Sequence, residues 1–268
     1  MKKKILITGA SGFIGKYLVK SLIKKNHQIT VVIKKKHGYL FGKKKIKYIF
    51  VKNIFKEKKA WWKNKLKKID TVVHLAWEAK PPNYQSSRKN IDCLIGSLNI
   101  ASACIEVNVK KFVGIGTCFE YQMGQKKNLS IKTPLGPKTL YALCKACLFI
   151  TLKEIFKKSK TSFIWTRLFY VFGEGDHKEK LIPYIINKLK LGKKIIINNP
   201  NKIKDYINVE KVSDRLEKII VTDKKTLPVY NICSGKGQSI KELTNKISKK
   251  YKLNKNITYK KNETKNFD

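Results

Sequence analysis

Three side chains that suit proton transfer occur in one part of this sequence: Thr117, Tyr141 and, four positions later, Lys145. Reduction of a carbonyl requires a proton at oxygen while a hydride reaches carbon. A tyrosine hydroxyl, with a pKa of about 10 in isolation, can donate that proton. A lysine one helical turn away can stabilise the phenolate, and a threonine hydroxyl can orient the same carbonyl. The set therefore predicts a carbonyl-reducing site with Tyr141 as the proton donor.

A glycine-rich turn near the N-terminus indicates where a hydride carrier binds. The string TGASGFIG directly follows an apolar, strand-like run and opens a helix-like stretch. Glycine allows a tight turn and a close backbone approach to a pyrophosphate, whose charge a helix N-terminus favours. We expect a dinucleotide site that contains Gly9, Ser11, Gly12, Phe13, Ile14 and Gly15.

The residues after the second apolar run bear on the choice of dinucleotide. Enzymes that bind NAD usually place an acid there, against the ribose hydroxyls. Here Ile33 is followed by Lys34, Lys35 and Lys36, whose cations suit the 2′-phosphate of NADP. We therefore favour NADP(H), with Lys34 at the ribose, and keep NAD(H) as the alternative. Asn53, after the third run, is interpreted equally well as an adenine contact or a turn residue.

The sequence is strongly basic, with a formal net charge of +42 from 60 basic and 18 acidic residues. Such charge is common in proteins that bind nucleic acid. Only Arg88, Arg167 and Arg215 are arginine, however, and arginine has the planar fork that suits phosphates and bases. Lysine, asparagine and isoleucine are enriched in all parts of the chain, which indicates compositional bias. We expect polyanionic small molecules as ligands, and no nucleic acid.

The sequence also indicates where the protein resides. No apolar run approaches the length of a membrane span, and the N-terminus lacks a signal-peptide pattern, so we expect a cytoplasmic protein without membrane contact. Six cysteines lie within apolar segments, which predicts reduced core thiols. Cys144 and Cys147 form a C-x-x-C without a second pair nearby, so no metal site is predicted.

Short apolar runs alternate with stretches of helical periodicity. The predicted strands are Lys4–Thr8, Ile29–Ile33, Ile46–Val51, Thr71–Leu75, Phe112–Gly116 and Phe163–Leu168. Long helices are predicted over Ile91–Ile105 and Leu140–Phe156, and Thr117 follows the fifth strand, at the sheet edge where ligands gather. The predicted fold class is α/β, with a Rossmann-type doubly wound parallel sheet and a small C-terminal lobe.

After about Gly173 the alternation loosens, which indicates a second lobe. Its predicted pieces are helices at Leu181–Leu191, Val209–Ile220 and Ile240–Lys249, and strands at Tyr206–Val209 and Val229–Ile232. We place a dinucleotide-binding domain at 1–172 and a mostly substrate-binding lobe at 173–268, with some segments returning to the first domain. The segments Phe41–Lys47 and Phe55–Lys68 are interpreted as solvated faces, and Tyr259–Asp268 as a frayed end.

These motifs together resemble the extended short-chain dehydrogenase/reductase family, which acts mainly on nucleotide sugars. The resemblance runs nearly end to end, through TGASGFIG, VVHLAW, GTCFEYQ, YALCK, TRLFYVFGEGD, KDYINVEKV and YNICSG. It implies further cofactor contacts from Leu75, Ala76 and Trp77, besides Tyr141 and Lys145. It implies substrate contacts from Glu78, Cys118, Tyr170, Leu181, Lys204 and Asp205. The family also implies a homodimer, formed through the helices Ile91–Ile105 and Leu140–Phe156.

Several positions depart from the common family pattern. Tyr170 stands in place of an asparagine, Lys204 in place of an arginine, and Ala142 in place of a frequent glycine. The chain also ends early relative to the family. We therefore expect a substrate lobe that is incomplete at its C-terminus.

Three reactions compete within this family. The 4,6-dehydratases carry an Asp–Glu pair, or at least the Glu, after the catalytic threonine. Cys118 and Phe119 hold those places here and Glu120 comes one position later, which argues against dehydration. A 4-epimerase must retain NAD, and the missing acid at Ile33 argues mildly against it. We favour reduction of a nucleotide-linked 4-keto-6-deoxyhexose, with the 4-epimerase as the alternative.

Two further hypotheses stay open. Cys118 and His177 resemble an acid–base pair that some family members use to epimerise beside the keto group, although a core thiol and a solvated histidine are the simpler interpretation. In another class, the chain is a non-catalytic, dinucleotide-dependent regulator or an RNA-binding member of the superfamily. Such members often lose the tyrosine or the lysine, whereas Tyr141 and Lys145 are both present here.

Overall fold

The computed structural model describes residues 2–42, 46–124, 128–222, 229–250 and 257–260. The chain divides into two compact units. The first consists of Met1–Ala79, Asn83–Leu168 and Val209–Ile232. The second consists of Lys80–Pro82, Phe169–Asn208 and Cys233–Asp268.

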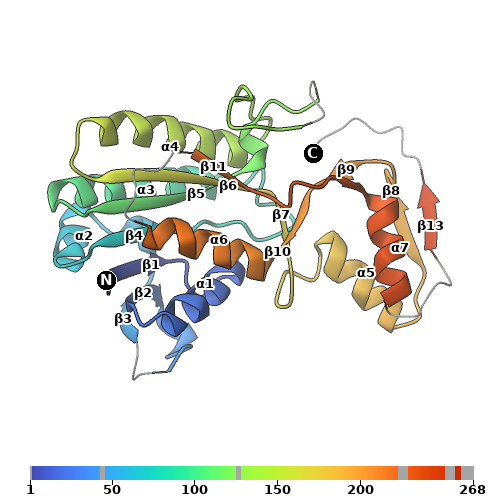
Figure 1. Ribbon diagram of the computed structural model, residues 1–268, viewed down its shortest axis with the longest axis horizontal. Coiled ribbons are helices and arrows are strands. Elements are labelled where there is room, and N and C mark those ends of the chain that lie inside the picture. Colours follow the sequence, from blue (N-terminus) through green and yellow to red (C-terminus); the bar gives the residue numbers. More distant parts are fainter. Residues whose placement is uncertain (1, 43–45, 125–127, 223–228, 251–256, 261–268) are drawn as a thin grey trace. The chain divides into compact units, whose positions relative to one another are not determined.

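The first unit is built on a parallel sheet, whose seven described strands have the order β11-β6-β5-β4-β1-β2-β3 (Figure 1). They are β1 (Lys4–Thr8), β2 (Gln28–Lys34), β3 (Ile46–Val51), β4 (Thr71–His74), β5 (Lys111–Thr117), β6 (Ser162–Leu168) and β11 (Val229–Ile232). The strand order reverses between β1 and β4. In open parallel sheets, ligands bind outside the carboxyl ends of the strands at such a reversal.

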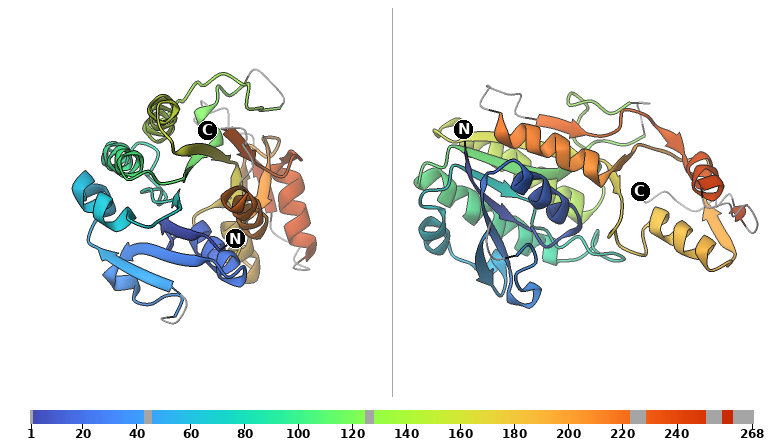
Figure 2. Two further views of the ribbon diagram at one scale, coloured as in Figure 1. Left: turned by 60° about the vertical axis from the view of Figure 1, so that its left-hand side comes forward. Right: turned by 60° about the horizontal axis from the view of Figure 1, so that its bottom comes forward.

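Helices cover both faces of this sheet. They are α1 (Phe13–Lys24), α2 (Lys59–Leu66), α3 (Lys89–Glu106), α4 (Leu140–Lys157) and α6 (Val209–Val221), with short 3₁₀ turns η1 (Lys35–His37), η2 (Ile54–Lys56) and η3 (Cys118–Glu120). On one face α6 packs beside α1, and on the other α3 packs between α2 and α4 (Figure 2). The strands are therefore buried on both sides, which is why they read as continuous apolar runs.

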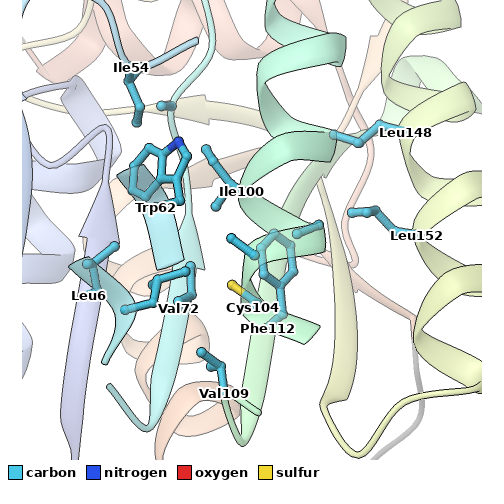
Figure 3. Close-up of a cluster of buried hydrophobic side chains, with 14 of the residues drawn as sticks. Leu6, Ile54, Trp62, Val72, Ile100, Cys104, Val109, Phe112, Leu148 and Leu152 are labelled. Atoms are coloured by element: carbon cyan, nitrogen blue, oxygen red, sulfur yellow. The ribbon is translucent and has the colours of Figure 1, made fainter. Parts of the chain in front are cut away.

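One layer of the core lies between the sheet and α2, α3 and α4. Figure 3 shows Trp62 of α2, Ile100 of α3 and Leu152 of α4 pointing toward side chains of the sheet such as Phe112. All four side chains are fully buried. Burial of large side chains of this kind stabilises a fold by roughly 1.5–3 kcal/mol each, before the conformational entropy that folding costs.

The second unit contains short elements. They are β7 (Tyr170–Phe172), α5 (Leu181–Lys190), β8 (Ile195–Asn198), β9 (Ile203–Lys204), β10 (Tyr206–Asn208), β12 (Gln238–Ser239), α7 (Ile240–Lys250) and β13 (Ile257–Lys260). Three two-stranded pairings join β7 with β10, β9 with β12, and β8 with β13. A separate small core forms where Ile185 and Leu189 of α5 pack with Ile195, Ile197 and Ile240.

The α/β fold class with its doubly wound parallel sheet is confirmed. The interpretation of Phe55–Lys68 as a solvated face was wrong, because α2 lies within it and buries Trp62 and Leu66. Lysines on its outer side masked the inward-facing stripe. In Phe41–Lys47, residues 43–45 lie outside the described part. In Tyr259–Asp268, the first two residues belong to β13 and residues 261–268 also lie outside it.

One other expectation is corrected by the structure. Cys147 is exposed on α4, whereas Cys93, Cys104, Cys118 and Cys144 are buried as the apolar context predicted. A cysteine in an apolar helix can point outward if that helix has an apolar outer face. The chain returns to the first unit after residue 208, where α6 and β11 complete the parallel sheet.

Candidate functional site

The glycine-rich turn joins β1 to α1 at the reversal of strand order. Gly9 has a φ of +71°, and a Cβ there would lie 2.6 Å from the backbone nitrogen of Ala76. A Cβ on Gly15 would lie 2.3 Å from the carbonyl oxygen of Gly9. A Cβ on Gly12 would meet only that same oxygen, at 3.2 Å. Gly9 and Gly15 are thus required by the turn, whereas Gly12 leaves its backbone open on one side.

This turn fits the pyrophosphate of a dinucleotide. Within the described residues, no side chain caps the N-terminus of α1, which begins after Gly12. The first turn of a helix carries N–H groups without intrahelical partners and a partial positive charge. Ser11, Phe13 and Ile14 lie at the same turn. A phosphate is the kind of group that satisfies such a helix start.

A buried hydrogen-bond chain fixes the ends of β1 and β4 beside this turn. The ring of His74 joins Thr8 Oγ1 at Nδ1 and Ser97 Oγ at Nε2, each at 2.8 Å. The Ser97 hydroxyl donates to the Cys93 carbonyl, and the Ala76 N–H donates to Thr8 Oγ1. Burial lowers the pKa of His74 to about 3, so the ring is neutral. His74 is therefore a hydrogen-bonded residue of the core.

Lys34, at the end of β2, lies next to the loop that follows β4. Its Nζ is 3.8 Å from Glu78 Oε1, and both side chains are about half exposed. Glu78 therefore brings a carboxylate to the region where β2 itself lacks one. Asn53 uses its Oδ1 to accept a hydrogen bond from the Phe55 N–H at the start of η2, so its carbonyl acts as a turn cap.

The proton-transfer set gathers at the carboxyl end of β5. Thr117 ends this strand, and its side chain is within hydrogen-bonding reach of Tyr141 near the start of α4. Thr139 caps α4 through the Ala142 N–H at 3.2 Å, while the Tyr141 N–H donates to the Gln85 carbonyl. Burial raises the pKa of the Tyr141 phenol, because the phenolate would be poorly solvated there.

Lys145 lies one turn further along α4 and is almost fully buried. Its Nζ donates to the Ile115 carbonyl at 2.6 Å and lies 3.8 Å from the ring centroid of Trp77. Burial lowers the pKa of Lys145 to about 7, although the Glu120 carboxylate opposes that shift. The pKa of this lysine therefore lies in the range that suits general acid–base chemistry at neutral pH.

Aromatic side chains enclose Tyr141. The Tyr84 ring meets it edge-on with centroids 5.0 Å apart, and the Trp77 ring does so at 6.4 Å. The Trp77 indole N–H donates to Asn90 Oδ1 at 2.7 Å. Asn90 and its contacts were missed from the sequence, because an asparagine near the start of a helix is common and belongs to no motif that we considered.

Glu120 does not occupy a substrate position. Its carboxylate is fully buried and accepts from Arg167 Nε at 2.7 Å, from the Trp165 indole N–H and from the Thr117 N–H at 2.8 Å. Burial raises the pKa of Glu120, and the Arg167 guanidinium opposes that shift. Arg167 also donates to the Tyr121 hydroxyl. The pair fixes the turn after Thr117, a role that residue spacing does not reveal.

The other predicted substrate residues fall in different parts of the chain. Cys118 is buried in the first unit, directly after Thr117. In the second unit, Lys204 Nζ lies 4.4 Å from the Tyr170 ring centroid. Asp205 accepts hydrogen bonds from the N–H groups of residues 234 and 235 at 2.7 and 2.8 Å. Leu181 begins α5 and packs on the small core there.

His177, the proposed partner of Cys118, belongs to the second unit. Its Nδ1 lies 4.0 Å from Glu179 Oε2 and accepts a hydrogen bond from the Glu179 N–H. Across the described ranges, no group of three or more histidine, cysteine or acidic side chains is arranged to hold a metal ion. No helix in those ranges is both long enough and apolar enough to cross a membrane.

Comparison with known proteins places this arrangement in context. The chain is 24% identical over 247 residues to the dTDP-6-deoxy-L-talose 4-dehydrogenase (NAD(+)) of Aggregatibacter actinomycetemcomitans, covering 88% of this chain and 86% of that protein. It is 28% identical over 261 residues to the dTDP-D-glucose 4,6-dehydratase of Dictyostelium discoideum, covering 86% of this chain and 58% of that protein.

A solved structure shows the same fold. It is UDP-N-acetylglucosamine 4-epimerase from Methanobrevibacter ruminantium M1, with a TM-score of 0.87 and 23% identity over 98% of this chain and 87% of that one. The model of the family described as NAD dependent epimerase/dehydratase matches residues 5–233, from β1 to the end of β11. The chain therefore belongs to the NAD-dependent epimerase/dehydratase family of enzymes, which confirms the resemblance seen in its motifs.

Proposed function

We propose that this protein is an NAD(P)-dependent oxidoreductase that reduces a nucleotide-linked 4-keto-6-deoxyhexose. One observation carries the proposal. Thr117 and Tyr141 meet at the carboxyl end of β5, and the positions where a dehydratase carries acids hold Cys118 and Phe119. Glu120, the nearest carboxylate in sequence, is bound to Arg167. A carbonyl reduction requires the hydroxyl groups and the lysine, whereas dehydration requires an additional acid–base pair.

Each member of the set has a distinct role in this reaction. Tyr141 donates a proton to the carbonyl oxygen, and Thr117 orients that oxygen by a hydrogen bond. Lys145, as an ammonium group, stabilises the phenolate that Tyr141 becomes. A nicotinamide dinucleotide bound at the Gly12 turn supplies the hydride.

The choice between NAD(H) and NADP(H) belongs to the same proposal. Lys34, Lys35 and Lys36 support NADP(H), as the sequence indicated. The Glu78 carboxylate, 3.8 Å from Lys34 Nζ, supports NAD(H), because it partly neutralises that lysine and would repel a 2′-phosphate. The relative from A. actinomycetemcomitans is also named as an NAD(+) enzyme. We therefore assign NAD(H), with NADP(H) as the alternative.

Substrate contacts from the second unit complete the proposal. Tyr170, Lys204 and Asp205 lie around the short strands β7, β9 and β10, and Lys204 has a cationic group above an aromatic ring. An aromatic ring and a cation suit the base and the phosphates of a nucleotide. We assign these residues and Leu181 to contacts with the nucleotide sugar, and we propose Glu78 and Cys118 of the first unit as further substrate contacts.

Cofactor oxidation by the purified protein tests the assignment. NADH and NADPH are offered separately with dTDP-, GDP- and CDP-linked 4-keto-6-deoxyhexoses. We expect turnover that Tyr141→Phe lowers by about 10²- to 10⁴-fold, because the general acid is lost, while cofactor binding is retained. The Tyr259→Phe variant, on β13, is a control for loss of a phenol elsewhere.

Two other outcomes would replace the proposal. If no substrate oxidises either cofactor but NAD remains bound through purification, a 4-epimerase that returns the hydride is the better assignment. If Tyr141→Phe changes nothing and the protein stays on heparin or RNA at physiological salt, a non-catalytic, nucleic-acid-binding role is favoured.

We also propose a homodimer formed by α3 and α4. These helices pack side by side, and each exposes apolar side chains on its outer face. Ile91 and Ile95 of α3 are 44% and 55% exposed, and Leu143 and Ile150 of α4 are 48% and 52% exposed. Apolar side chains that face the sheet would be buried, whereas these four are exposed. Each helix therefore carries a second apolar stripe on its outer face. Two copies of this face would bury it.

A further inference from the structure

We propose that Trp77, held in place by Asn90, is a positioning residue that keeps the Lys145 ammonium group in place beside the reacting tyrosine. The inference rests on the proposed function for its meaning, but it concerns contacts within the protein itself. Neither residue is a candidate for proton transfer. Both act through Lys145.

The side chain of Asn90 uses all of its polar groups in hydrogen bonds. It is fully buried at the start of α3. Its Oδ1 accepts the Trp77 indole N–H at 2.7 Å, and its Nδ2 donates to the carbonyls of Tyr84 and Ser87 at 2.7 and 2.8 Å. Both amide hydrogens and the oxygen are therefore used, so this side chain has one orientation. A buried amide with all its partners in place holds a rigid geometry.

Asn90 links the loop after β4 to the segment that leads into α3. The rings of Trp77 and Tyr84 both meet the Tyr141 ring edge-on. Asn90 binds the indole N–H of Trp77 and the backbone carbonyl of Tyr84. The Tyr141 N–H also donates to the Gln85 carbonyl at 2.9 Å. A single asparagine thus fixes two of the aromatic walls that enclose the phenol.

Trp77 has a second contact, with Lys145. The ammonium nitrogen lies 3.8 Å from the indole ring centroid, well inside the range of a cation–π interaction, and also donates to the Ile115 carbonyl. The indole cannot slide away from the lysine while its N–H is bound to Asn90. Trp77 is therefore oriented with its negative face toward a buried cation.

Other charged groups near Lys145 do not replace this contact. The titratable groups that face it are Glu120 from η3, Cys93 from α3 and His74 from β4. Burial raises the pKa of Cys93 to about 11 and lowers that of His74 to about 3, so both are neutral between pH 6 and 9. The Glu120 carboxylate is bound to Arg167. The indole face is thus an additional, uncommitted source of stabilisation for the ammonium form.

Removal of this face should make Lys145 lose its proton more readily. A cation–π contact stabilises the ammonium form, so its loss lowers the pKa of the lysine. Starting from a pKa of about 7, a fall of one unit would lower the protonated fraction about tenfold at pH 8 but only about twofold at pH 6. The effect is therefore specific to the basic side of the pH profile.

The first measurement is the titration of Lys145 itself, without substrate. The protein is labelled at the lysine ε-carbons, and the Lys145 resonance is assigned by its loss in Lys145→Arg. We expect its pKa to be lower in Trp77→Leu, with a smaller shift in Trp77→Phe, which keeps an aromatic face. Trp61→Leu is the matched control, because Lys65 lies 5.5 Å from the Trp61 ring on α2. A Lys145 pKa that stays the same or rises in Trp77→Leu overturns the proposal.

The second measurement is the pH profile of kcat and kcat/KM with the cofactor and sugar that the wild-type protein uses. We expect Trp77→Leu to lower kcat more at pH 8 than at pH 6, and Asn90→Ala to change the profile in the same direction. A loss that is equal at every pH would indicate a purely structural role and contradict the proposal. If the wild-type protein turns over no sugar, the proposed function fails, whereas the titration still decides the role of Trp77.

Discussion

Burial sets the proton affinities of the residues around the site. It raises the pKa of Tyr141 and lowers those of Lys145 and His74, to about 7 and about 3. At neutral pH the tyrosine is therefore a protonated phenol, as a proton donor must be. Lys145 is poised between its two forms. A small change in its surroundings can then change the protonated fraction greatly.

The buried imidazole of His74 makes folding stability depend on pH. Its folded-state pKa of about 3 lies below its ordinary value of 6.5, so the unfolded chain binds more protons between these limits. The free energy of unfolding should fall as pH drops from 6.5 toward 3, by up to about 1.4 kcal/mol per pH unit. We expect His74→Gln, which does not titrate, to show a shallower dependence in urea unfolding at pH 7, 6 and 5. Parallel curves for the two proteins would contradict this.

The carboxylate of Glu78 should influence cofactor choice. Glu78→Gln removes a negative charge next to Lys34, so a 2′-phosphate would meet less repulsion. We expect the ratio of kcat/KM for NADPH over NADH to rise about three- to tenfold, equivalent to roughly 1 kcal/mol. Glu179→Gln, in the second unit, serves as the control. An unchanged ratio would remove Glu78 from the cofactor site.

At the scale of elements, two strand ends bring the site together. The turn after β1 and the capping box after β5 both lie at the carboxyl edge of the sheet. Thr117 accepts from the Phe119 N–H while Glu120 accepts from the Thr117 N–H. This reciprocal capping holds the threonine at the strand end, so its position depends on a buried carboxylate in the next turn.

Two glycines of the β1–α1 turn, Gly15 and Gly12, should respond differently to substitution by alanine. In Gly15→Ala the new Cβ would meet backbone at 2.3 Å, and we expect a loss of about 1–3 kcal/mol in the free energy of unfolding. In Gly12→Ala the nearest atom is 3.2 Å away and φ is −74°, so stability should change little while NAD affinity falls. Denaturant unfolding measures the stability of both variants, and calorimetric titration measures their affinity for NAD. Equal destabilisation by the two variants would refute the distinction.

For the whole molecule, charge and apolar surface act in opposite directions on self-association. The net charge of +42 makes two copies repel each other. In the proposed dimer the outer faces of α3 and α4 would attract each other, because they expose Ile91, Ile95, Leu143 and Ile150. Salt screens the repulsion within about 10 Å at 0.1 M ionic strength and leaves the apolar term in place. Dimer formation should therefore strengthen as salt is added.

A double change on that face tests the proposed dimer. We expect Ile95→Glu with Ile150→Glu to sediment as a monomer under conditions where the wild-type protein is a dimer, because two buried acids would have no partner. Leu191→Glu, at an exposed site after α5, should leave the association unchanged. If the wild-type protein is monomeric at all salt concentrations, this surface is not a self-association site.

The features that the sequence determined by itself were those that depend on local or periodic patterns of residues. The strands β1 and β3 and the start of α4 were predicted to the residue, because apolar periodicity and the glycine turn depend only on near neighbours. Such patterns also led to the family and to the set of Thr117, Tyr141 and Lys145. In α2, by contrast, surface lysines concealed the periodic signal.

Only the tertiary structure decided which distant residues contact one another around the candidate site. Trp77 with Lys145, Glu120 with Arg167, and Lys34 with Glu78 are pairs separated by dozens of residues in the chain. No spacing rule links such partners, because their contact depends on strand order and on how each helix packs on the sheet. The candidate reacting groups could therefore be predicted from the sequence, whereas the burial and the contacts that shift their pKa values arise from the packing of distant segments.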